Sequence, residues 1–157
     1  MRLARPGLCF QFIPLAFVAA LCTAAPCLAA ESRESWQQPE RVVCDLGLKA
    51  DATVADVGAG RGYFTFRLAA AVGEKGKVYA TDIDTKALQA VKDQAAKQNI
   101  KNIETVPGDP TDTKLAPASV DTALLCDVLH HVDAPLREAL VKNIAAAIKP
   151  GGYLFII

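Results

Sequence analysis

The stretch VADVGAGRGYF, residues 54–64, constrains the fold more than any other part of this chain. A short apolar run that includes Asp56 leads into three glycines at alternate positions, Gly58, Gly60 and Gly62. Glycine tolerates positive φ and lets a ligand approach the backbone closely. The pattern therefore predicts a buried strand, a tight turn without side chains, and a helix that begins at the turn.

Strand-like and helix-like segments alternate along the rest of the chain. Such alternation is typical of a parallel sheet with helices on both faces and right-handed crossovers. We therefore expect an α/β fold, a Rossmann-like doubly wound parallel sheet, with residues 31–157 forming one domain. The expected strands lie in residues 52–58, 76–84, 103–109, 119–132 (with its C-terminal loop) and 153–157, and the expected helices in residues 35–48, 63–73, 84–99 and 134–149, the last stopped by Pro-Gly-Gly at 150–152.

Carboxylates stand at the ends of four of the expected strands. They are Asp56, Asp82, Asp109 and Asp127. In an open parallel sheet, ligands bind beyond the carboxyl ends of the strands, at the point where the strand order reverses. We therefore expect these four acids to converge on one crevice.

The glycine spacing separates three candidate ligands. A dinucleotide fingerprint requires a small residue at position 63, where this chain has Tyr63, and a P-loop requires a Gly-Lys-Ser/Thr sequence that is missing here. Arg61 is the only cation within the loop, which is little provision for a pyrophosphate. An acid just ahead of the glycines suits an ammonium group. S-adenosylmethionine carries such a group, a ribose diol and no phosphate.

The second strand-end acid suits the same ligand. Asp82 follows Gly62 by twenty residues, and a carboxylate at that place can accept hydrogen bonds from both ribose hydroxyls. Asp109 could accept a hydrogen bond from an adenine amino group, and Asp127 lies nearer the place where a methyl acceptor would enter. The adjoining Ala59 and Ile83 complete the set of predicted cofactor contacts.

Five segments together resemble a known family. The chain is similar to the class I S-adenosylmethionine-dependent methyltransferases, in particular the small-molecule group related to the ubiquinone and menaquinone biosynthesis methyltransferases. The similarity extends from residue 37 to the last residue, in the order and spacing of that family. The segments that carry it are VADVGAGRGYF, VYATDID, PGD, VDTALLCDVLHHV and IKPGGYLFII.

The resemblance implies roles for particular residues. Asp56 and the glycine loop would hold the methionine portion of the cofactor, Asp82 the ribose and Asp109 the adenine. The Thr or Ser that is usual between the second and third glycines is Arg61 here, which leaves the fold assignment intact but affects the contacts of the loop.

The methyl transfer itself requires little from the protein beyond positioning of the acceptor. A general base is required only if the acceptor must lose a proton. The candidates are Asp127, His130 and His131; for the two histidines, the alternative interpretation is packing and hydrogen bonding within the loop. No pair of cysteines with histidines has the spacing of a metal site. Three of the five cysteines lie within residues 1–30. The other two, Cys44 and Cys126, are expected to be inert core thiols rather than a disulfide.

Two other classes of function were considered. A non-catalytic domain that retains the cofactor pocket stays an alternative, and a nucleotide-dependent oxidoreductase is disfavoured by Tyr63. The chain carries 17 basic and 17 acidic side chains, and without Arg2 and Arg5 the part after residue 30 has two more acids than bases. Nucleic acid is therefore not expected as a partner, because its binding requires clustered cations. We expect a small-molecule acceptor, and the sequence does not indicate an oligomeric state.

Residues 1–30 have the layout of a secretory signal peptide. A short cationic start precedes an apolar run with a small-residue end near Ala29 or Ala30, and polar residues follow abruptly. The prediction is export to the periplasm, with an uncleaved membrane anchor as the alternative and membrane contact only if the leader is retained. Related methyltransferases usually have two further strands after the fifth, so we expect the sequence to be truncated after its fifth strand.

Overall fold

A computed structural model describes residues 33–157 of the chain. The predictions of a signal peptide or anchor in residues 1–30 lie outside the described residues and stay predictions. The part from Glu31 to Ile157 forms one compact unit.

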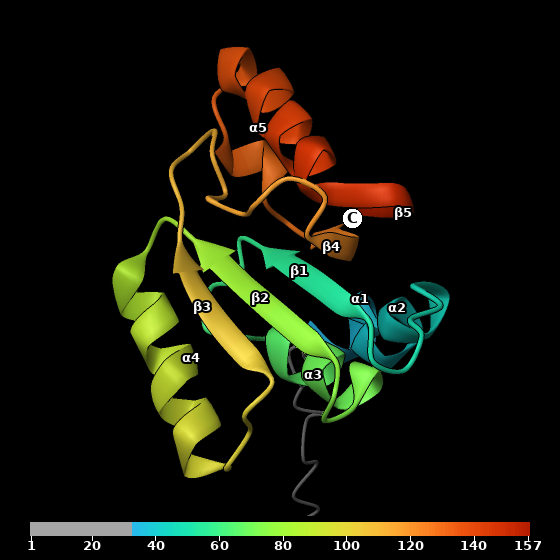
Figure 1. Ribbon diagram of the computed structural model, residues 1–157. Helices are drawn as coiled ribbons and strands as arrows, with labels where there is room; N and C mark the ends of the chain where they lie inside the picture. The colour runs from blue at the N-terminus through green and yellow to red at the C-terminus, as the bar shows by residue number, and fades with distance from the viewer. Residues whose placement is uncertain (1–32) are drawn as a thin grey trace, which may run out of the picture. The chain divides into compact units, whose positions relative to one another are not determined.

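The core of this unit is a five-stranded parallel sheet in the order β3-β2-β1-β4-β5 (Figure 1). This confirms the predicted Rossmann-like α/β fold. The strands are β1 (Thr53–Val57), β2 (Lys77–Asp82), β3 (Ile103–Pro107), β4 (Val120–Leu125) and β5 (Ile148–Ile156). Because β2 and β3 lie to one side of β1 and β4 and β5 lie to the other, the strand order reverses beside β1. A ligand site is expected beyond the carboxyl ends of the strands at this point.

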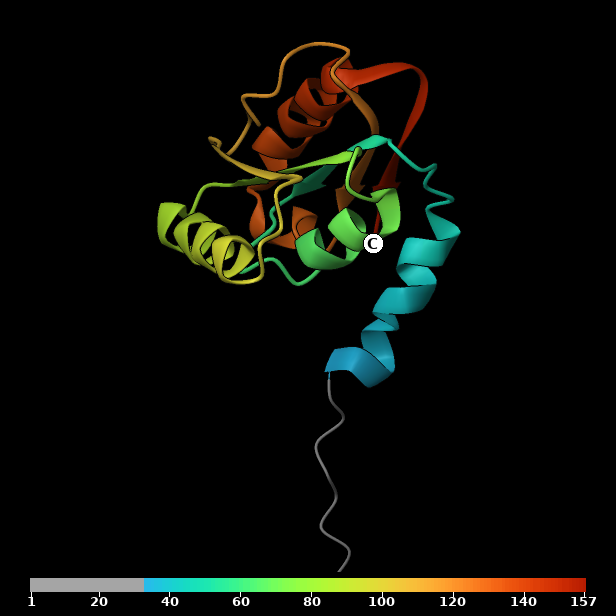
Figure 2. The same ribbon diagram turned by 60° about the horizontal axis from the view of Figure 1, so that its bottom comes forward.

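Helices cover both faces of the sheet, as Figure 2 shows with α5 on one side and α3 and α4 on the other. The helices are α1 (Arg33–Gln37), α2 (Pro39–Asp45), α3 (Thr65–Val72), α4 (Thr85–Lys97), the short 3₁₀ helix η1 (Leu129–His131) and α5 (Ala134–Ala147). Val54 and Val78 pack with Leu68 of α3, whereas Ala55 and Ala123 pack with Ile144 of α5. Neighbouring strand residues point to opposite faces, so both faces of β1 are buried, which explains why apolar residues follow one another directly at Val54 and Ala55.

The expected single helix over residues 35–48 is two helices. The break falls at Gln38, which has a φ of 45° and directly precedes Pro39. A proline disfavours the α conformation of the residue before it, and this steric effect ends α1. Cys44 of α2 is exposed and free, so the prediction of a core thiol is wrong there, while Cys126 is buried and free as predicted.

The last helix and strand meet earlier than the sequence predicts. Helix α5 ends at Ala147, before the Pro-Gly-Gly sequence, and β5 begins at once with Ile148. The register of β5 against β4 shifts between Val120 and Thr122. A Cβ atom on Gly152 would lie 2.3 Å from the carbonyl oxygen of Asp121, so the irregular strand passes β4 only because residue 152 has no side chain.

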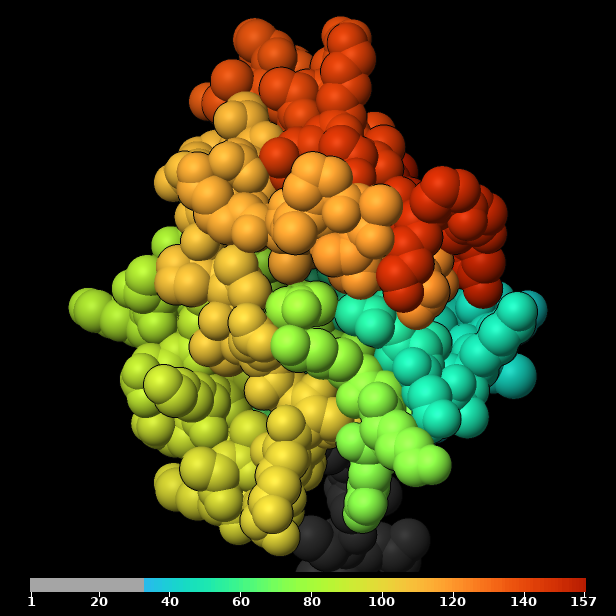
Figure 3. Space-filling model, in the orientation of Figure 1, coloured from blue at the N-terminus to red at the C-terminus, as the bar shows by residue number. Residues whose placement is uncertain are grey.

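The segment that joins β3 to β4 lies on the face of the molecule seen in Figure 3, where its orange atoms lie between the red α5–β5 part and the green and yellow β2–β3 part. Hydrogen bonds attach it to both neighbours. The Thr81 hydroxyl of β2 donates to the carbonyl oxygen of Thr113 at 3.2 Å, and the Thr113 amide donates to Asn143 Oδ1 of α5 at 2.9 Å. The segment is therefore held against the strand that carries Asp82.

Candidate functional site

The glycine loop between β1 and α3 folds back onto the neighbouring strand. The amides of Gly58 and Ala59 donate to the carbonyl oxygen of Thr81 at 2.8 and 3.1 Å. Gly58 has a φ of 74°, and a Cβ atom there would lie 2.2 Å from Cγ2 of Val128. The backbone therefore has to be bare at this position for two separate reasons, its conformation and its close packing.

Asp82, at the end of β2, fixes the next part of the loop. Its Oδ2 accepts a hydrogen bond from the Gly60 amide at 2.7 Å, and its Oδ1 accepts one from the Asp84 amide at 2.8 Å. Each carboxylate oxygen can accept a second hydrogen bond. Asp82 is thus held in one orientation while it keeps acceptor capacity for a ligand. Asp84 caps α4 by accepting from the amides of Lys86 and Ala87, as its residue type predicts.

A cavity of about 410 Å³ lies at the strand ends, beside Asp82 and Gly58 of the glycine loop. Its volume falls within the usual range for small-molecule sites. Five of the predicted cofactor residues line it, and apolar side chains of the η1–α5 region complete the lining. The five are Gly58, Asp82, Ile83, Asp109 and Asp127.

A second hollow, of about 870 Å³, is lined by several residues of the glycine loop. Gly58, Asp127 and His131 line both hollows, so the two adjoin. The second one is also lined by Asp56, Ala59, Gly60 and His130 of the predicted set, together with aromatic side chains from α1 and the start of α3. Gly62 lines neither hollow, because a Cβ atom there would lie 2.7 Å from the ring of Phe66.

Asp56 is a buried carboxyl group in the floor of the second hollow. Only 3% of the residue is exposed, and Oδ2 accepts a hydrogen bond from the Thr65 hydroxyl at 2.6 Å. The pKa of Asp56 is raised from 3.8 to about 6, mainly by burial and in smaller part by the nearby negative charge of Asp82, while the hydrogen bond from Thr65 opposes the rise. A cation bound beside Asp56 would therefore stabilise the ionised form of this carboxyl group.

Helix α1 brings two functional candidates that the sequence did not predict, Arg33 and Trp36. Both line the second hollow, and Trp36 is 56% exposed. The Arg33 guanidinium lies 4.0 Å from the centre of the Tyr63 ring and 3.4 Å from Asp127 Oδ2. The sequence shows only that Arg33 and Trp36 precede the first strand. No spacing rule connects these two residues with the strand ends, so their place in the site could not be predicted.

The same helix is attached to the end of β4. The side-chain amide of Gln37 donates to Cys126 Sγ at 2.9 Å. Burial raises the pKa of the Cys126 thiol to about 11, so it stays protonated at neutral pH. Cys126 is therefore a structural contact for α1 and not a nucleophile.

The two histidines and Asp127 lie where the hollows meet. Asp127 has a φ of 57°, and the rings of His130 and His131 in η1 have centroids 3.9 Å apart and planes tilted by 46°. His131 lines both hollows and His130 only the second. Of the two, His131 is thus better situated to contact a group that reaches from one hollow to the other.

Within residues 33–157, no His, Cys, Asp and Glu side chains form a group of three or more that could hold a metal ion. No helix in that part of the chain has the length and apolar character to cross a bilayer.

Comparisons with known proteins agree with this geometry. A demethylmenaquinone methyltransferase from Staphylococcus aureus is 29% identical over 122 residues, which are 78% of this chain and 48% of the relative. The crystal structure of a SAM-dependent methyltransferase from Aquifex aeolicus superposes with a TM-score of 0.73 at 32% identity, over 81% of this chain and 66% of that one. Coclaurine N-methyltransferase bound to N-methylheliamine and SAH has the same fold, with a TM-score of 0.70 at 19% identity, over 84% of this chain and 38% of that one.

This chain spans about half the length of the curated relatives that it matches. Its residues 54–152 match the family described as the methyltransferase domain, a range that begins in β1, contains the glycine loop and ends in β5. The match confirms the predicted similarity to class I methyltransferases related to quinone biosynthesis. The chain belongs to the methyltransferase domain family.

Proposed function

We propose that this chain binds S-adenosylmethionine across the two adjoining hollows and transfers its methyl group to a small-molecule acceptor. The observation that carries the proposal is Asp82, whose carboxylate is fixed by the Gly60 and Asp84 amides beside the bare backbone of Gly58. This arrangement suits a ligand whose ribose diol is bound by Asp82 and whose neighbouring atoms pass close to the backbone of the loop.

The residues present fit the cofactor at three points. Asp56 in the second hollow offers a buried carboxylate to the ammonium group, Asp82 offers acceptors to the ribose hydroxyls, and Asp109 in the first hollow offers an acceptor to the adenine amino group. The two hollows share Gly58, Asp127 and His131, which allows the nucleoside to lie in one and the amino-acid end in the other.

When bound, S-adenosylmethionine supplies a methyl group on a sulfonium, which is a good leaving group. The chain's own residues hold the acceptor in line with the methyl–sulfur bond and exclude water. If the methylated atom carries a proton, that proton must leave, and His131, with its ring in both hollows, is the candidate to accept it.

We further propose an acceptor of the reduced quinone class. The Staphylococcus aureus relative is named for demethylmenaquinone. The second hollow supports a flat aromatic acceptor, because Trp36, Tyr63 and Phe64 contribute to its lining. A ring carbon that takes the methyl group must release its proton, so this acceptor class requires a base such as His131 or Asp127.

The test is transfer of a labelled methyl group from S-adenosylmethionine to a chemically reduced naphthoquinone without an isoprenoid chain. We expect transfer by the wild-type chain, and a rate lowered about 10²- to 10⁴-fold by His131→Asn if the histidine moves the proton. His130→Asn, which alters the neighbouring ring that lines the second hollow alone, is the matched control and should retain more of the rate.

Affinity for S-adenosylhomocysteine separates binding from catalysis and should change little in either histidine variant. A chain that binds S-adenosylhomocysteine but labels no acceptor, quinol or other, would instead be a non-catalytic binding domain. Labelling of acceptors of another chemical class would contradict only the proposed quinol acceptor.

A further inference from the structure

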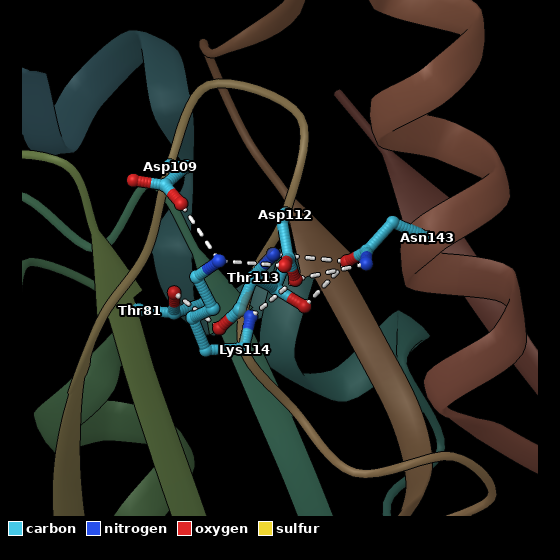
Figure 4. A network of polar contacts seen from close by, with 6 residues as sticks. All are labelled: Thr81, Asp109, Asp112, Thr113, Lys114 and Asn143. Carbon is cyan, nitrogen blue, oxygen red and sulfur yellow. Dashed lines mark hydrogen bonds and ion pairs between the residues drawn. The ribbon is translucent and has the colours of Figure 1, made fainter.

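The loop after β3 contains a chain of polar contacts that no part of the proposed reaction accounts for (Figure 4). Asp109 and Asp112 close a tight turn, because each backbone amide donates to the carbonyl oxygen of the other, at 2.7 and 3.1 Å. Lys114, with a φ of 58°, directs its side chain back over this turn. Its Nζ lies 2.7 Å from Asp109 Oδ2 and 2.7 Å from Asp112 Oδ2.

Asn143 of α5 fixes the far end of this chain of contacts. Its Oδ1 accepts from both the amide and the hydroxyl of Thr113, at 2.9 and 2.7 Å, and its Nδ2 donates to Asp112 Oδ1 at 3.0 Å. Contacts therefore run from Asn143 through Asp112 and Lys114 to Asp109, and Thr81 attaches the same loop to β2.

These contacts engage only one carboxylate oxygen of Asp109, the Oδ2 that pairs with Lys114. Figure 4 shows Oδ2 directed at Lys114 and the other oxygen directed away from the network. Asp109 also lines the first hollow, on the same side of the glycine loop as Asp82. A carboxylate held in this way presents one acceptor in one direction, whereas a free carboxylate on an exposed loop can turn.

We infer that Lys114 and Asn143 are positioning residues that orient Asp109 so that the site selects a hydrogen-bond donor at position 6 of the purine of its ligand. The inference rests on the proposed function. Adenine presents an amino group at that position and hypoxanthine presents a carbonyl oxygen, which would face the carboxylate oxygen without a proton between them. A carboxylate free to turn could instead accept from the N1–H of hypoxanthine, and discrimination would be lost.

Folding stability depends little on the ion pair between Lys114 and Asp109. The Lys114 and Asp109 side chains are 47% and 61% exposed, and ion pairs this exposed contribute little to stability. Replacing Lys114 is therefore expected to leave a folded chain, in which a change of ligand preference can be measured.

The experiment is calorimetric titration of the full chain with S-adenosylhomocysteine and with S-inosylhomocysteine, which differs at position 6 of the purine. For wild type we expect the adenine ligand to bind about tenfold to a hundredfold more tightly. Lys114→Met and Asn143→Ala should reduce this ratio to within about threefold, and Lys114→Arg should restore part of it.

The matched control is Lys142→Met. Lys142 neighbours Asn143 in sequence, is 75% exposed and pairs with Glu138 rather than with the loop, so its replacement should leave the ratio unchanged. A ratio in Lys114→Met equal to that of wild type, or a wild-type chain that binds both ligands equally, would overturn this inference alone. A folded wild-type chain that binds neither ligand would overturn the proposed function together with it.

Discussion

Replacing Asp82 by alanine is expected to lower the affinity for S-adenosylhomocysteine by at least about a hundredfold. The carboxylate is proposed to accept both ribose hydroxyls, and hydrogen bonds to a charged group contribute about 1.5–3 kcal/mol each. The substitution also releases the Gly60 and Asp84 amides, which the carboxylate holds at 2.7 and 2.8 Å, so the glycine loop loses one of its attachments to β2. Calorimetric titration at constant pH and salt measures the change.

Asp84→Ala is the matched control for this prediction. Asp84 lies two residues further along, and its side chain caps α4 through the Lys86 and Ala87 amides. Its loss should cost about 1 kcal/mol of folding stability and change the affinity by less than about threefold. An Asp82→Ala chain that is folded and binds with wild-type affinity would show that the ribose does not lie at the end of β2.

Replacing Asp56 by asparagine is expected to have two opposite effects, a more stable chain and weaker ligand binding. Burial raises the pKa of Asp56 from 3.8 to about 6, and each pKa unit corresponds to about 1.4 kcal/mol. Keeping the buried carboxylate ionised at pH 8 therefore costs about 3 kcal/mol of folding free energy. Asparagine removes this cost and can still accept the hydrogen bond from the Thr65 hydroxyl.

The sign of the pH dependence follows from the direction of the shift. The folded chain holds the Asp56 proton more tightly than the unfolded chain, so the wild type loses stability as the pH rises from about 4 to about 6 and no more above that. The stabilisation by Asp56→Asn should thus reach about 3 kcal/mol at pH 8 and be close to zero at pH 4. Urea unfolding at the two pH values measures it, and equal effects at both would contradict the assignment.

Ligand binding should follow the opposite trend with pH. An ammonium group beside Asp56 favours the carboxylate, so affinity for S-adenosylhomocysteine should be constant above about pH 7 and weaken below the Asp56 pKa of about 6. The Asp56→Asn chain should bind about tenfold more weakly at pH 8 and show little of this pH dependence. A variant that binds as tightly as wild type would place the ammonium group elsewhere, with Asp127 as the next carboxylate in the lining.

Much of this fold follows from local patterns in the sequence. The strands β1 and β4 are largely buried on both faces and are therefore mostly apolar without strict alternation, and the amphipathic α4 begins next to Asp84, where the sequence predicts a helix to start. The convergence of Asp82, Asp109 and Asp127 on one cavity follows from topology, because parallel strands end at the same edge of the sheet. That prediction requires only the parallel arrangement of the strands and no knowledge of side-chain contacts.

The features that the sequence did not predict depend on contacts between distant residues. Arg33 and Trp36 enter the site because Gln37 reaches Cys126, 89 positions away. Lys114 contacts Asp109 because a positive φ turns it back over the turn, and Asn143 lies 31 positions beyond its partner Asp112. Helix α1 ends before Gln38, where the steric effect of a proline overrides the helical spacing of the apolar residues.

The most direct test of cofactor binding is calorimetric titration of the full wild-type chain with S-adenosylhomocysteine at pH 8, after circular dichroism has established that the chain is folded. We expect saturable binding of one ligand per chain, with a dissociation constant in the micromolar range or below. A folded chain that takes up no S-adenosylhomocysteine at millimolar concentration would contradict this expectation, because Asp82 and the glycine loop would then hold another ligand or none.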